Sequence, residues 1–164
     1  MLTQSSALLT GLPPVLNSQT RILILGSFPG AASLAAAQYY AHPRNQFWRL
    51  LSALFNEDFV TLHYAERLNR IAERHVGLWD VIAACERKGS LDTAIRQAQQ
   101  TDFSILKKTY PAIHTIVFNG KTAGKAAPVF EAAGYRTCIL PSSSPAHAQL
   151  SFAQKLVQWR QLLG

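Results

Sequence analysis

The sequence lacks the residue spacings of the common metal centres. Its two cysteines, Cys85 and Cys138, lie far apart and form no C-x-x-C pair, and its five histidines include no H-x-x-x-H spacing. Zinc and iron–sulfur sites are built from such clusters. We therefore expect no metal and no cofactor, and unpaired cysteines of this kind are typical of a reducing compartment.

Long apolar runs and targeting signals are also missing. No uninterrupted apolar stretch approaches the roughly 18 residues that a membrane helix needs. The opening residues, MLTQSSALLTGLPP, lack the basic region with which a signal peptide begins. We expect a cytoplasmic protein with no membrane partner.

Three familiar catalytic motifs are absent as well. The chain has neither the G-x-G-x-x-G of dinucleotide-binding proteins nor the G-x-S-x-G of serine hydrolases. Gly120-Lys121-Thr122 resembles the end of a phosphate-binding loop, but Thr115 stands where that motif needs its first glycine. These absences argue against dehydrogenases, α/β-hydrolases and nucleoside triphosphatases.

Charged residues are few, and they are unevenly distributed along the chain. Only 15% of the 164 residues are charged and 48% are apolar, as in a compact globular protein, and we expect a single domain over residues 1–164. Residues 1–82 hold six Lys or Arg against five Asp or Glu, whereas residues 83–164 hold ten against four. Such a basic half fits either a nucleic-acid partner or a basic enzyme without one.

Hydrophobic patterning alternates between strands and helices. Short apolar runs predict strands at 22–25, 76–82, 114–118 and 136–140. Helical spacing predicts helices over 46–55, 62–74, 102–108, 121–133 and 149–163, and residues 1–20 read as an irregular lead-in. This alternation predicts a three-layer α/β/α fold with a short, mostly parallel four-stranded sheet.

Each predicted strand is followed by a polar or glycine-rich stretch. Because parallel strands end at the same edge of a sheet, we expect these stretches to meet at one site. They are Gly26–Gly30, Asp80, Asn119-Gly120 and Ser142–His147.

Taken singly, these residues allow two interpretations. Asn119 is either a turn residue before Gly120 or an amide that reads a planar polar edge. The run Ser142–Ser144 is either a polar turn or a phosphodiester contact. Phe28 and Tyr40 are either core residues or faces on which a flipped base stacks, and Asp80 is either an ion-pair or capping residue or a catalytic group.

Taken together, the motifs resemble the uracil-DNA glycosylase superfamily, and within it most closely the hypoxanthine-DNA (deoxyinosine) glycosylase branch. The resemblance runs from about Pro13 to Leu162. The motifs that carry it, in chain order, are Gly26-Ser27-Phe28-Pro29-Gly30, Tyr40–Trp48 (YAHPRNQFW), Leu78-Trp79-Asp80-Val81, Phe118-Asn119-Gly120 and Leu140–Ala146 (LPSSSPA).

The resemblance implies a monofunctional DNA glycosylase that flips a deaminated base out of the duplex and cuts its N-glycosidic bond. Phe28 stands where the superfamily has the Asn or Asp that assists water, so the resemblance makes Asn45 the catalytic residue. Leu140 stands where some relatives have a histidine that donates to the leaving base, so the group that activates the base is left unassigned.

The remaining roles also follow from the resemblance. Bound bases would contact Phe28, Tyr40, Phe47 and Asn119. DNA phosphates would contact Ser142, Ser143, Ser144 and His147, and Asp80 is a further candidate. The expected partner is DNA containing deaminated bases, bound by a monomer.

Two other functions stay open at this stage. The first is a glycosylase of the same fold directed at uracil or xanthine, because pocket selectivity depends on a few hydrogen bonds that sequence does not place. The second is a catalytically silent nucleic-acid-binding module, which the replacement of the motif Asn by Phe28 allows.

Overall fold

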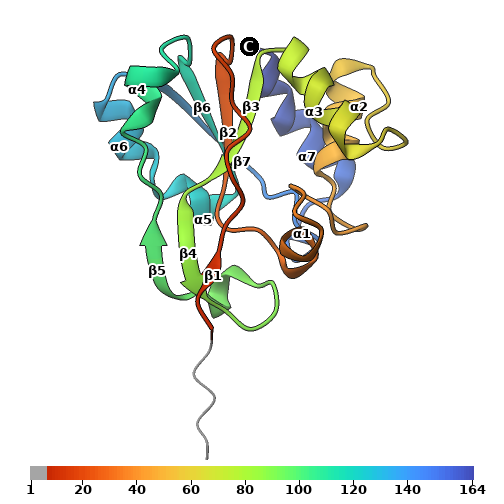
Figure 1. Ribbon diagram of the computed structural model, residues 1–164. Helices are drawn as coiled ribbons and strands as arrows, with labels where there is room; N and C mark the ends of the chain where they lie inside the picture. The colour runs from red at the N-terminus through yellow and green to blue at the C-terminus, as the bar shows by residue number, and fades with distance from the viewer. Residues whose placement is uncertain (1–6) are drawn as a thin grey trace, which may run out of the picture.

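A parallel four-stranded sheet forms the centre of the computed structural model, which describes residues 7–164 (Figure 1). Its strands are β2 (Ile22–Gly26), β3 (Val76–Asp80), β6 (Thr115–Asn119) and β7 (Arg136–Leu140), in the order β3-β2-β6-β7. In β2, the residues Leu23, Ile24 and Leu25 are fully buried. Continuous apolar runs of this kind belong to strands that are covered on both faces.

Helices cover the two faces of this sheet and bury two separate cores (Figure 1). On one face, Ile24, Leu78 and Val117 pack with side chains of α2 (Phe47–Phe55), α3 (Tyr64–Glu73) and α7 (Phe152–Trp159). On the other, Leu23, Ile116 and Phe118 pack with side chains of α4 (Ile105–Thr109), α5 (Lys121–Gly124) and α6 (Ala127–Ala132). A short helix, α1 (Ala31–Ala36), follows β2. The predicted three-layer α/β/α class is confirmed.

A second, antiparallel sheet was not predicted. It consists of β1 (Leu9–Thr10), β4 (Ile82–Glu86) and β5 (Arg96–Gln100), in the order β1-β4-β5. The expectation of an irregular lead-in over residues 1–20 therefore fails at β1, and Val15 also pairs with Leu78 of the central sheet. Residues 1–6 lie outside the described part of the chain.

The predicted strand 76–82 divides between the two sheets. β3 ends at Asp80 and β4 begins at Ile82, while the Val81 and Ile82 amides donate to the carbonyls of Gly26 and Ser27. The chain thus leaves the central sheet at the point where β2 also ends. This change of sheet places the hairpin of β4 and β5 beside the carboxyl edge of the central sheet (Figure 1).

Two predicted helices are each divided into two consecutive helical elements. The helix predicted over 121–133 is interrupted between α5 and α6, because Pro128 has no N–H to donate and favours the first turn of a new helix. The closing helix begins at Ser151, whose side chain and that of Gln154 form a reciprocal capping box. It then continues as a 3₁₀ turn, η2 (Arg160–Leu163).

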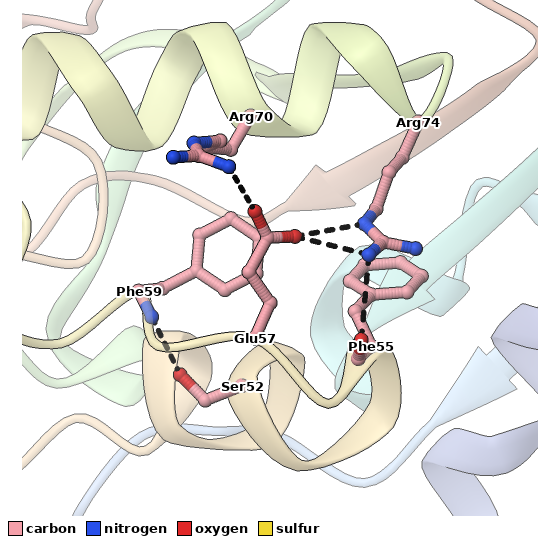
Figure 2. A network of polar contacts seen from close by, with 6 residues as sticks. All are labelled: Ser52, Phe55, Glu57, Phe59, Arg70 and Arg74. Atoms are coloured by element: carbon pink, nitrogen blue, oxygen red, sulfur yellow. Dashed lines mark hydrogen bonds and ion pairs between the residues drawn. The ribbon is translucent and has the colours of Figure 1, made fainter.

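Figure 2 shows how the loop after α2 is attached to α3. The Glu57 carboxylate accepts from Arg70 at 2.9 Å and from Arg74 at 3.0 and 3.1 Å. The Arg74 guanidinium also lies 4.4 Å from the centre of the Phe55 ring. One carboxylate therefore holds Arg70 of α3 and Arg74 at the end of that helix.

Replacing Glu57 by alanine should lower the free energy of unfolding by about 1 kcal/mol, because partly exposed ion pairs contribute roughly 0.2–1 kcal/mol each. Urea denaturation at low salt measures the loss, and added salt should reduce the difference from wild type. The network lies away from the cavity described below, so the variant should retain wild-type activity. A variant as stable as wild type at low salt would contradict the assignment.

None of the helices within residues 7–164 is long and apolar enough to cross a membrane.

Candidate active site

A cavity of about 460 Å³ opens at the carboxyl edge of the central sheet. Six separate stretches of the sequence contribute to its wall, several of them at strand ends, as parallel topology predicts. They are residues 26–33, 39–45, Asp80, 90–93, Asn119, and 142–147, although not every residue within these ranges faces the cavity. Its volume lies in the range of sites that bind small molecules or single bases.

Phe28 lies in the cavity wall and is held there by a buried arginine. Its side chain is only 6% exposed, and the Arg87 guanidinium lies 5.2 Å from the centre of its ring. Arg87 donates to the carbonyl of Pro29 at 2.6 Å and to that of Gly89 at 2.8 Å. A single side chain thus fixes the glycine- and proline-rich turn after β2 to the end of β4.

Tyr40 and Phe47 have different places in the site. The two rings stack with their centres 3.9 Å apart and their planes 22° from parallel. Tyr40 lines the cavity, whereas Phe47 has no exposed surface and is not part of its wall. Phe47 therefore supports Tyr40 from behind, and we correct its assignment from direct base contact to this support.

Asn45 lines the cavity with half of its amide already engaged. Its Oδ1 accepts a hydrogen bond of 3.0 Å from the Phe47 amide at the start of α2. That bond fixes the orientation of the side chain. The Nδ2 group has no partner among the described residues and remains available to donate to a ligand in the cavity.

Asn119 and Ser143 are joined by two reciprocal hydrogen bonds. The Asn119 Nδ2 donates to the Ser143 Oγ, and the Ser143 amide donates to the Asn119 Oδ1, both at 2.9 Å. The Ser143 carbonyl accepts from the Gln46 amide at 2.9 Å. Both residues are buried, and Ser143 joins the end of β6 to the segment that carries Asn45, so we correct its assignment from phosphate contact to this structural role. Much of the Asn119 amide is therefore used within the protein.

Replacing Ser143 by alanine should lower the free energy of unfolding by roughly 1–3 kcal/mol, because the buried Asn119 Nδ2 loses its acceptor. Chemical denaturation measures the loss. The exposed Ser151→Ala variant, which loses a helix cap instead, is the matched control and should cost about 1 kcal/mol. A Ser143 variant with wild-type stability would show that the hydrogen bonds between Asn119 and Ser143 do not contribute to the free energy of unfolding.

The hydroxyl groups of the two other serines in the run 142–144 can still donate hydrogen bonds. The Ser142 Oγ accepts from the Ser144 amide at 3.1 Å, and the Ser144 Oγ accepts from the Ala146 amide at 3.2 Å. Each hydroxyl can still donate its own hydrogen to an anion. Burial, together with the positive charges of Lys155 and Lys121, lowers the pKa of His147. The outer rim of the cavity thus combines hydroxyl donors with nearby cationic side chains.

Asp80 is buried in the cavity wall without a hydrogen bond to its carboxyl. Its side chain is 5% exposed, and its Oδ2 has no partner among the described residues. Burial, and secondly the charge of Asp92, raise the pKa of Asp80 to about 7. A carboxyl in this state exchanges a proton near neutral pH, which is the property of an acid–base group.

One wall of the cavity was missed by sequence reasoning. Residues 90–93 line it, and they include the start of the 3₁₀ turn η1 (Asp92–Ala94). The Ser27 hydroxyl donates to Asp92 at 2.7 Å, and the Ala31 amide donates to the Ser90 Oγ at 2.9 Å. The only local signal was the turn at Gly89-Ser90, which predicts a loop but not its position beside the site.

Within residues 7–164, no three His, Cys, Asp or Glu side chains gather in a metal-binding cluster.

The parallel sheet, with a ligand-sized cavity at its carboxyl edge walled by aromatic, amide and hydroxyl groups, defines a small-molecule-binding site on a protein of the three-layer α/β/α class. Residues 13–163 match the sequence model of the uracil DNA glycosylase superfamily, and the chain belongs to that superfamily.

Named relatives lie close in sequence. The chain is 46% identical to "Hypoxanthine DNA glycosylase" of Methanosarcina barkeri over 137 residues, which cover 84% of this chain and 87% of the relative. It is 42% identical to the protein of the same name from Methanosarcina acetivorans over 141 residues, or 86% and 89% of the two chains.

A solved structure has the same fold. The solution NMR structure of a Methanosarcina acetivorans protein described as a "putative Uracil DNA glycosylase" matches with a TM-score of 0.84 at 38% identity. The match covers 96% of this chain and 100% of the other. The predicted superfamily is therefore confirmed, and the names of the two sequence relatives support the predicted branch.

Proposed function

We propose that the protein is a monofunctional DNA glycosylase that removes hypoxanthine from deoxyinosine in DNA and leaves an abasic site. The observation that supports this proposal is the cavity, whose lining includes Phe28, Tyr40 and Asn45 with its free Nδ2. Sequence similarity to two proteins named hypoxanthine DNA glycosylase supports hypoxanthine as the base that is removed.

A base can enter this cavity only after it has left the duplex. Unstacking costs a few kcal/mol, and aromatic faces such as those of Phe28 and Tyr40 recover part of that cost by stacking. We assign the base contacts to these two rings, supported by Phe47 from behind, with Asn119 holding the adjacent loop in place.

Asn45 is the proposed catalytic residue. An amide is too weak a base to deprotonate water, so the reaction would proceed through an oxocarbenium-like transition state in which positioning and electrostatics supply the catalysis. Because its Oδ1 is engaged by the Phe47 amide, Asn45 would act through Nδ2, by donating to the attacking water or to the base.

The rim of the cavity provides the proposed DNA contacts. Ser142, Ser144 and His147 would contact phosphates on either side of the flipped nucleotide, while the buried Ser143 holds the loop in shape. The net charge of +7 at pH 7 favours binding to a polyanion, and phosphate contacts make such binding strongly salt-dependent. The protein would act as a cytoplasmic monomer on DNA containing deaminated bases, without a cofactor.

Labelled duplexes that each carry one deoxyinosine, deoxyuridine, deoxyxanthosine or normal base test this function directly. They are incubated with the protein in the presence of a chelator and then cleaved with alkali at abasic sites. Cleavage at deoxyinosine is expected. Cleavage at deoxyuridine alone would reassign the substrate to uracil, and salt-dependent binding without any cleavage would identify a silent DNA-binding module.

A further inference from the structure

Some polar groups of the cavity wall already have hydrogen-bond partners within the protein, and others have none among the described residues. The amide of Asn119 is engaged with Ser143, and the Oδ1 of Asn45 is engaged with the Phe47 amide. The Asp80 Oδ2 and the Tyr40 hydroxyl are buried and have no partner among the described residues. Buried polar groups are rarely left unpaired, and such a group in a cavity wall points to a ligand that completes it.

The Asp80 carboxyl and the Tyr40 hydroxyl lie on either side of Gly26. Gly26 ends β2 between them, and a Cβ built on it would lie 2.6 Å from the Asp80 Oδ1 and 3.2 Å from the Tyr40 hydroxyl. The absence of a side chain at Gly26 therefore makes room for both groups. They line the same cavity, so one planar base could reach both.

The surroundings of Asp80 favour its neutral form. The elements packed around the carboxyl contribute the carboxylate of Asp92 and the hydroxyls of Tyr39 and Tyr40. No cation contributes to the shift of the Asp80 pKa, which burial and Asp92 both raise. A neutral carboxyl carries an acidic O–H that can donate to a ligand and transfer its proton near neutral pH, whereas the hydroxyl and amide donors of this wall are far too weakly acidic to transfer theirs.

The reaction itself needs such a donor. When the bond between C1′ and N9 breaks, its electron pair passes to hypoxanthine, and the charge that develops on the purine must be neutralised. A group with a pKa near the working pH is the most effective acid for this purpose. Asn45, the proposed catalytic residue, carries only an amide, which is too weakly acidic to give up a proton, so Asp80 is the cavity-lining group whose pKa suits this step.

Building on the proposed function, we propose that the Asp80 carboxylic acid is the catalytic acid that protonates the departing hypoxanthine. As the C1′–N9 bond breaks, the proton of Asp80 moves to N7 of the base, and the carboxylate remains. Water then bonds to C1′, and the proton that it releases restores Asp80. The products are neutral hypoxanthine and an abasic site, and no other reactant is consumed.

Single-turnover excision of hypoxanthine by wild type and Asp80→Asn, measured from pH 5 to 9 with enzyme in excess, tests this role. The wild-type rate constant should fall about tenfold per pH unit above about 7, because only the protonated acid acts. The variant should be slower by roughly 100-fold or more at pH 6, as expected for loss of a general acid, and should lack that decline.

Binding of duplex DNA containing 2′-fluoro-deoxyinosine, which resists cleavage, separates this role from a structural one. Asp80→Asn should bind it within threefold of wild type, whereas a loss that appears entirely in binding would overturn the proposal. Asp102→Asn, an exposed carboxyl outside the cavity wall, is the matched control and should keep the wild-type rate and pH profile.

Two outcomes distinguish failure of this inference from failure of the function. The acid role alone would be overturned if Asp80→Asn released hypoxanthine at the wild-type rate. It would also be overturned if the rate constant of the variant fell above pH 7 as that of wild type does. Failure of the wild-type protein to release hypoxanthine at any pH would overturn the glycosylase function and the acid role together.

Discussion

Replacing Asn45 by alanine should lower the rate of hypoxanthine excision at least ~100-fold and leave the fold intact. Loss of one positioned polar group from a preorganised site commonly has an effect of this size. The Oδ1 of Asn45 also accepts from the Phe47 amide, so the free energy of unfolding should fall by about 1 kcal/mol. Single-turnover kinetics and chemical denaturation measure the two effects separately.

Asn45→Asp is the matched variant for this experiment. It retains an acceptor for the Phe47 amide but replaces the free Nδ2 donor with a carboxylate oxygen. If the donor is needed, the aspartate variant should be as stable as wild type and nearly as inactive as the alanine variant. Excision close to wild type by Asn45→Ala would remove Asn45 from the mechanism.

Asp80→Asn should stabilise the protein in neutral and alkaline solution. The pKa of Asp80 rises from an ordinary value of 3.8 to about 7 on folding, so the folded protein holds a proton that the unfolded chain loses between these values. Wild-type stability should therefore decline as pH rises through this window. Each pKa unit corresponds to about 1.4 kcal/mol, and the full cost above pH 7 is on the order of 4 kcal/mol.

Guanidinium denaturation of wild type and Asp80→Asn at pH 4, 6 and 8 measures this cost. The variant's advantage should grow from pH 4 to pH 8, and a comparison across pH cancels any constant effect of the amide. Asp102→Asn is again the control, and its difference from wild type should stay nearly constant from pH 4 to 8, because hydrogen bonds from Ser104 lower the pKa of Asp102 below its ordinary value of 3.8. A pH-independent difference between wild type and Asp80→Asn would refute the shifted pKa.

The central sheet was predictable because its strands are buried on both faces. Runs such as Ile22–Leu25 admit few other interpretations, and β7 begins and ends where its pattern predicted. β5 was not predictable in the same way. Its sequence, RQAQQ, has no apolar pattern and all five residues are exposed, so only pairing with β4 makes it a strand.

The location of the candidate site was predictable from the sequence, but the hydrogen bonds and packing of its side chains were not. Parallel topology alone brings Gly26, Asp80 and Asn119 to one edge of the sheet. The direction in which a side chain faces and the partner that it finds depend on tertiary packing. Sequence therefore could not reveal that Phe47 faces the core or that Ser143 engages the Asn119 amide.

The exposure of β5 has a consequence for motion within the native state. Because no side chain of β5 is buried, detaching this strand breaks backbone hydrogen bonds but exposes little apolar surface. Segments of this kind open with far smaller free energies than the whole fold. When the Ser27–Asp92 and Ala31–Ser90 hydrogen bonds also break, such fluctuations would carry residues 90–93 away from the cavity. Its entrance could then widen to admit a base without unfolding of the central sheet.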